Sequence, residues 1–176
     1  MMKDKKELSD VFSGVSSLFV VKGGIKDLAT IVVDMDIPVV VDTLSYVEGE
    51  PTKNSVKVHG LSSDWVTLFE AGETNFSFDV PTKHPDVLEL FWGKGKDVLT
   101  STIGEDTFEG KTYTRKTIPI KLGFCILSAD EQNIFIVPEV DAIATNIFEN
   151  GQTMPHLVRV TGSVSTDDFS FLKKKA

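Results

Sequence analysis

The chain contains a single cysteine among its 176 residues, so it cannot build a disulfide framework within itself. Cys125 lies inside an apolar segment, where a thiol behaves as a small buried hydrophobe and not as a nucleophile. The three histidines, His59, His84 and His156, have none of the spacings found in zinc sites. We therefore predict neither an internal disulfide nor a metal site.

Catalytic and phosphate-binding motifs are also missing. The chain has no Gly-x-Ser-x-Gly elbow, and "GKGKD" at 93–97 lacks the spacing and the following Ser or Thr of a phosphate loop. The "DMD" stretch at 34–36 lacks the glycine and the distal glutamate of a calcium loop. One enzyme hypothesis remains open, namely an unrecognised catalytic arrangement such as Asp64 with His59. We predict that the protein is not an enzyme and needs no cofactor.

Long apolar runs are absent as well, since none approaches the length of about 18 residues that a membrane-spanning helix needs. The first residues superficially resemble a signal peptide, but Asp4, Glu7 and Asp10 interrupt the lysines and no small-residue cleavage site follows. The formal net charge of −8 argues against tight binding to a phosphate backbone. We expect a protein that contacts no membrane and is not secreted through a signal peptide.

What the chain does contain is typical of a folded domain. Hydrophobic residues make up 41% and charged residues 25%, and twelve phenylalanines are available to fill an interior. We expect one domain over 1–176, because this length can bury a real core and no internal repeat or linker is visible. The polar ends at 1–14 and 167–176 are expected to be flexible or ordered only on assembly.

β-Branched and aromatic residues dominate most of the chain, often in the alternation of a half-buried strand. In "NFSFDV" this alternation places Phe76, Phe78 and Val80 on one face. Strands are expected at 27–35, 37–47, 55–61, 75–80, 117–130, 133–148 and 156–166. The predicted fold is mainly β: a β-sandwich or partly open barrel of antiparallel strands, flanked by one short α-helix.

The helix is predicted at about 85–92, in "PDVLELFWG". Pro85 suits the first helical turn, where its missing N–H is not needed, and Gly93 suits a left-handed C-terminal cap. An apolar stripe broad enough to pack on a sheet comprises Val87, Leu88, Leu90, Phe91 and Trp92. Because so short a helix is unstable alone, we expect Leu88→Asp to prevent folding.

The segment at 94–117 is polar and rich in glycine, and it is expected to be a long loop or a protruding hairpin. Its cations are conspicuous in an acidic protein, and acidic faces of a neighbouring subunit are plausible targets for them. The candidate subunit-contact residues are Lys94, Lys96, Lys111, Tyr113, Arg115 and Lys116. A simple solvated loop is the alternative.

Three stretches carry a family resemblance: "VVVDTLSYVEGEPT", the "TNFSFDVPT" strand that leads into the helix, and the late "IFIVP" strand that is followed by "VTGS". In this order they resemble the phage major tail proteins, which form the tail tube, over most of residues 15–165. Related tubes occur in injection machines. The segment 94–117 and the lysine tail have no clear counterpart in this resemblance.

The resemblance implies a structural virion protein in the phage tail, made in the host cytoplasm. Its subunits would form a homo-oligomeric ring, a hexamer by the family pattern, and the rings would stack into a tube together with other tail proteins. DNA would pass through this tube without sequence-specific binding, and an acidic lumen would repel the phosphates instead of trapping them.

Two other readings of the sequence remain open. The first is a different β-sandwich of a virion, such as a capsid decoration or baseplate module. The second is a β-sandwich that binds a small molecule or a glycan, with Trp65 and Trp92 as candidate stacking platforms. Exposed tryptophans would favour the second reading, whereas buried ones would favour a role in core packing.

Overall fold

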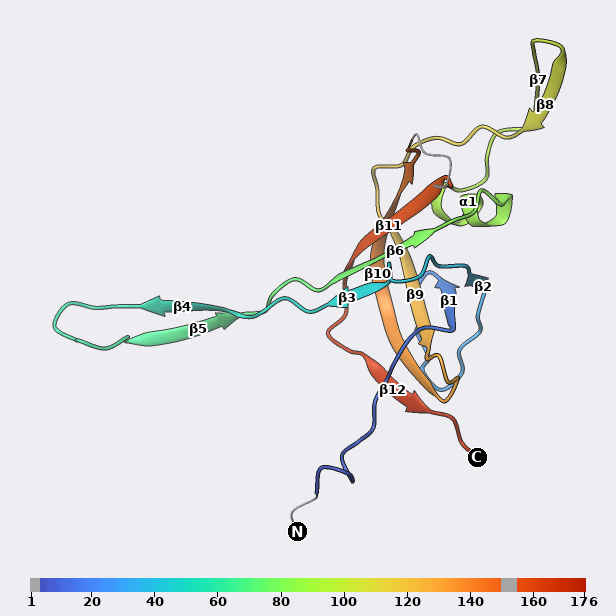
Figure 1. Cartoon of the computed structure of the whole chain (residues 1–176). Helices are drawn as coiled ribbons and strands as arrows, with labels where there is room; N and C mark the ends of the chain where they lie inside the picture. Colours follow the sequence, from blue (N-terminus) through green and yellow to red (C-terminus); the bar gives the residue numbers. More distant parts are fainter. Residues whose placement is uncertain (1–3, 150–154) are drawn as a thin grey trace.

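A computed structural model describes residues 4–149 and 155–176 of the chain. The fold is mainly β, with antiparallel strands and one short helix, which confirms the predicted fold class at this level (Figure 1). Of the predicted N-terminal extension, residues 1–3 lie outside the described residues.

One large antiparallel sheet forms the body of the protein. Its strands lie in the spatial order β2 (Met35–Ile37), β1 (Ser17–Lys22), β9 (Ile120–Leu127), β10 (Asn133–Ile147), β11 (Leu157–Val164), β6 (Asn75–Val80) and β3 (Ser45–Val47). A further strand, β12 (Ser170–Lys173), pairs with the first residues of β10. Within the described residues β2 pairs only with β1 and β3 only with β6, so the two ends of the path do not pair with each other and the sheet is not a closed barrel.

The hydrophobic core lies on one face of this sheet, because alternate residues of each strand point to the same side. Its centre is aromatic: the ring centroids of Phe76 and Phe124 are 4.6 Å apart, and those of Phe78 and Phe124 are 5.5 Å apart. In β10 the register shifts between Val137 and Val140, and this bulge accommodates Pro138, which has no N–H for the ladder.

The helix α1 (Pro85–Trp92) covers the core at one end, and its bounds confirm the sequence prediction. The side chain of His84 accepts a hydrogen bond from the Asp86 N–H and so satisfies one of the unpaired donors of the first turn. Gly93 ends the helix with φ 78° and ψ −178°, and its N–H donates to the Glu89 carbonyl. The prediction of a left-handed helical cap is therefore wrong in ψ, although the positive φ still favours glycine.

Two hairpins lie outside the main sheet. The first consists of β4 (Thr52–Val56) and β5 (Val66–Glu70), and the second of β7 (Leu99–Ile103) and β8 (Asp106–Gly110). Figure 1 shows both of them projecting from the body in different directions, the first beyond β3 and the second beyond α1. The predicted loop or hairpin at 94–117 therefore contains a hairpin.

Several predicted strands are confirmed: those at 117–130, 133–148 and 156–166 contain β9, β10 and β11. The strand predicted at 27–35 is wrong, since only Met35 of it belongs to a strand. Just before this segment Ile25 lies over β9: a Cβ at Gly123 would lie 2.6 Å from Ile25 Cγ1, and the Ile25 N–H donates to the Pro138 carbonyl. Within the segment Val32 and Val33 are exposed, and its β-branched residues do not join the ladder.

The predictions at 37–47 and 55–61 also need correction. Residues 38–44 form no strand but link the two ends of the sheet, from β2 to β3. The predicted half-buried strand at 55–61 is wrong, because β4 ends at Val56 and all of its residues are exposed. The tail at 167–176, expected as an extension, contains β12.

Candidate assembly surfaces

The β7–β8 hairpin is amphipathic. Ser101 pairs with Phe108, so Phe108 shares a face with Leu99 and Ile103. These three apolar side chains are 55%, 53% and 67% exposed. The opposite face is polar and consists of Thr100, Thr102, Thr107 and Glu109.

An isolated two-stranded hairpin is marginally stable in water and usually needs a surface on which to bury its apolar face. In this protein the apolar face of Leu99, Ile103 and Phe108 remains open to solvent. A contiguous exposed apolar face of this kind is typical of a contact with another molecule. The apolar character of the hairpin was not predicted from the sequence, where the segment was described as polar and cationic.

The predicted contact residues of 94–117 lie around the stem of this hairpin. The Lys111 ammonium is 2.8 Å from the Glu89 carboxylate on α1, and the Lys96 N–H donates to the Thr112 carbonyl. The hydrogen bond from Lys111 lowers the pKa of Glu89, and it raises the pKa of Lys111. Both interactions hold the stem of the hairpin to itself and to the body.

The remaining members of the predicted set differ in their surroundings. Tyr113 is half-buried and packs against the core, and the Lys116 side chain lies beside Gly93. Arg115 and Lys94 are exposed. The structure thus places these residues at the stem, while the tip of the hairpin carries two acidic residues instead, Glu105 in the turn and Asp106 at the start of β8.

The predicted packing residues of α1 divide into two groups. Val87, Phe91 and Trp92 are buried, with 5%, 3% and 7% of their surface exposed. Leu88 and Leu90 are half-buried and pack at the margin of the same core. Leu88 and Trp92 also line a cavity of about 690 Å³ between the helix and the end of β10.

The β4–β5 hairpin projects farther from the body, and we call residues 50–71 the arm. Trp65, Leu68 and Phe69 of the arm are 62%, 57% and 68% exposed. At its base the two chains approach so closely that neither Gly49 nor Gly72 has room for a side chain. A Cβ at Gly49 would lie 2.6 Å from the Glu73 carbonyl oxygen.

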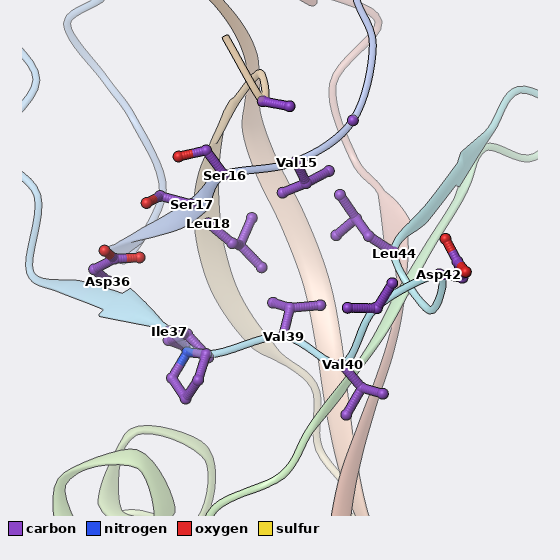
Figure 2. A pocket seen from close by; sticks show the side chains of 14 residues that line it. Val15, Ser16, Ser17, Leu18, Asp36, Ile37, Val39, Val40, Asp42 and Leu44 are labelled. Atoms are coloured by element: carbon purple, nitrogen blue, oxygen red, sulfur yellow. The ribbon is translucent and has the colours of Figure 1, made fainter. Parts of the chain in front are cut away.

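A groove lies where the two ends of the sheet fail to meet (Figure 2). It encloses about 680 Å³ between the start of β1 and the 38–44 link. Its apolar lining includes Val15, Leu18, Ile37, Pro38, Val39 and Leu44. Two carboxylates, Asp36 and Asp42, also line it, and Figure 2 shows them on opposite sides with Val39 between them.

The two terminal segments meet at an aromatic cluster next to the sheet. The ring of Phe171 on β12 lies 4.7 Å from that of Phe135 on β10 and 6.0 Å from that of Phe12. Phe171 remains 61% exposed. The contacts show how residues of both predicted extensions reach the body.

Chemistry outside these surfaces is sparse in residues 4–149 and 155–176. No group of three or more His, Cys, Asp or Glu side chains is placed to hold a metal ion there. Burial raises the pKa of the Cys125 thiol to about 11, and the Asp64 carboxylate lies 3.8 Å from the Lys53 ammonium. No helix in the described part of the chain is long and apolar enough to cross a bilayer.

Comparison with known proteins adds no family: no family model and no curated protein matches the chain. Sequence and structure together therefore define a mainly-β antiparallel protein with one short helix. What distinguishes its surface is the pair of projecting hairpins, each with large apolar side chains exposed to solvent.

Proposed function

We propose that this protein is a structural subunit of a phage tail tube, which assembles with copies of itself into stacked rings. The observation that carries the proposal is the pair of hairpins with uncovered apolar side chains, Phe108 on one and Trp65 and Phe69 on the other. A monomer gains nothing from holding these side chains in water, whereas an assembly buries them.

The sheet supports the same proposal through its ends. Both β2 and β3 have one unpaired edge within the described residues, and each strand spans only three residues. The 38–44 link connects the two ends of the sheet, which is compatible with the partly open barrel predicted from the strand pattern. Unpaired edges commonly pair with another chain, so neighbouring copies could extend the sheet around a ring.

Charge is a further support. The net charge of −8 is compatible with a conduit that DNA passes through without being held. The cations around the hairpin stem, Lys94, Arg115 and Lys116, stay as proposed contacts to acidic surfaces of neighbouring copies or of other tail proteins.

Self-association measured over a range of protein concentrations tests the proposal. Sedimentation velocity combined with electron microscopy should show rings, and at higher concentration short tubes. The double variant Ile103→Ser/Phe108→Ser should assemble less while keeping its unfolding free energy. Rings that form equally well without both hairpin side chains would contradict the role given to the hairpin.

A binding module is the second candidate, because Trp65 is 62% exposed and so could stack on a sugar or another planar ligand. Trp92 offers no such platform, since it is 7% exposed and packs against Phe91 with ring centroids 6.3 Å apart. Quenching of Trp65 fluorescence by a glycan, in a protein that stays monomeric, would favour this candidate over the tube subunit.

A further inference from the structure

We infer that the arm of one copy docks into the apolar groove between β1 and the 38–44 link of a second copy. The inference rests on the proposed self-assembly and identifies the surface that the arm contacts. The occupant of the groove is therefore a second copy of this chain, which would insert the aromatic side chains Trp65 and Phe69 of its arm.

One face of the arm is both aromatic and basic. Lys53 and Phe69 are direct cross-strand partners, so their side chains lie on the same face. Lys57 and Trp65, which is 62% exposed, lie just beyond the ends of the two strands, where the Trp65 N–H donates to the Val56 carbonyl. The other face carries Val66 and Leu68.

The groove complements this face in shape and polarity. Leu18 and Ile37 are almost fully buried and form its floor, while Val15 is 44% exposed at the rim. A volume of about 680 Å³ falls in the range of pockets that enclose a bound ligand. Aromatic side chains lose much apolar surface when they enter such a site, and aromatic residues are frequent anchors of protein interfaces.

Charges complete the match. Asp36 and Asp42 lie on opposite sides of the groove and form no ion pair within the described residues (Figure 2). Lys53 on β4 and Lys57 just beyond its end are four residues apart, which spans at most roughly 13 Å along the arm. Lys57 has no ion-pair partner among the described residues, and Lys53 has only the exposed contact to Asp64 at 3.8 Å. The arm thus offers two lysines beside two aromatics, and the groove offers two carboxylates in the lining around an apolar floor.

The geometry favours a contact between copies. In Figure 1 the arm leaves the body beyond β3 and points away from β1 and β2, which form one wall of the groove. Arm and groove are different surfaces, so the contact is head-to-tail, and such contacts build rings when they close and filaments when they do not. Both results agree with a tube.

Photo-crosslinking locates the contact directly. The variant Phe69→Cys carries a benzophenone maleimide, which spares Cys125 because that thiol is buried and its pKa is about 11. This protein is mixed with an isotope-labelled wild type, irradiated and digested. We expect crosslinks from the arm to residues 15–18 and 36–44 of the labelled copy. Crosslinks confined to other segments, or to the same copy, would overturn the inference.

Substitutions test both sides of the contact. Trp65→Ser/Phe69→Ser removes the anchors, and Val15→Asp/Val41→Asp changes exposed residues of the groove. Each pair should weaken self-association at least about tenfold. The matched control Val66→Ser/Leu68→Ser alters the opposite face of the arm and should weaken it less. Equal effects from both faces would contradict the assigned orientation.

Charge reversal adds a test in which the combined variant keeps the wild-type net charge. Lys53→Glu/Lys57→Glu, and separately Asp36→Lys/Asp42→Lys, should each weaken association, by about two- to fivefold per charge. The variant with all four changes has the wild-type net charge and should recover affinity. Failure to recover overturns the pairing.

The two proposals fail differently. A wild type that assembles with crosslinks outside the groove overturns the arm–groove contact alone. A wild type that stays monomeric at every concentration overturns the tube function and the contact with it.

Discussion

Arg159 on β11 holds Asp79 on β6 in a two-pronged ion pair, with Nε 2.9 Å from Oδ1 and Nη2 3.0 Å from Oδ2. Asp79 is 7% exposed, and the pair raises the pKa of Arg159 further. Asp79 also anchors the groove wall, because its backbone N–H donates to the Thr43 hydroxyl and its carbonyl accepts from the Val40 N–H. Loss of the pair should therefore affect both the sheet and the groove.

Arg159→Met leaves the Asp79 carboxylate nearly buried without its partner, so we expect it to lower the unfolding free energy by about 1–3 kcal/mol. Chemical denaturation measures this. Arg115→Met, an exposed arginine on the hairpin stem, is the control and should change stability by less than about 0.5 kcal/mol. Equal losses from the two arginines would show that the ion pair does not stabilise the fold.

The helix should depend more on Phe91 than on Leu88. Phe91 is 3% exposed, and Phe91→Ala should cost about 3–5 kcal/mol because it leaves a cavity in the core. Leu88 is half-buried beside a cavity, so Leu88→Ala should cost less. The expectation that Leu88→Asp prevents folding stays a prediction. Because Phe91 is more deeply buried than Leu88, we expect Phe91→Asp to destabilise the fold more. A larger loss at Leu88 would contradict this ranking.

Cys125 should make stability depend on alkaline pH. Because burial raises its pKa from 9.0 to about 11, the folded protein keeps the thiol proton that the unfolded chain releases. The contribution is fully present below pH 9 and is lost as the pH rises toward 11. Denaturation curves of wild type and Cys125→Ala from pH 8 upward should therefore converge. Rapid alkylation of native protein at neutral pH would contradict the burial.

The apolar face of the β7–β8 hairpin should contribute to association and not to folding. Phe108→Ser should raise the concentration needed for self-association and change stability by no more than about 0.5 kcal/mol, since the side chain is 55% exposed. Thr107→Ser, on the polar face, is the matched control. Sedimentation equilibrium of the two variants compares them, and identical association would leave this face without a function.

Much of the sheet could be predicted because its strands are buried. Phe76, Phe78 and Val80 alternate and enter the core, and the long strands β9 and β10 contain apolar runs at 122–127 and 134–138. The helix was predictable from local signals, namely Pro85 at its start and Gly93 after its end. Propensity, periodicity and burial agree at these positions.

The strand predictions fail where β-propensity and burial disagree. Val32 and Val33 are β-branched but lie 74% and 43% exposed in the link between β1 and β2, so the pattern predicted a strand that does not form. In the arm the strand was predicted at 55–61 from an alternating pattern, whereas β4 spans Thr52–Val56 and all of its residues are exposed. The groove joins residues of β1 with residues of the 38–44 link, and sequence alone could not place them together.

The most direct test of the central claim is electron microscopy of concentrated wild-type protein beside the arm variant Trp65→Ser/Phe69→Ser, at matched concentration and salt. The proposed function predicts rings with a central opening for the wild type, and their loss in a variant that remains folded. A wild type that stays as single particles at every concentration and salt would contradict it.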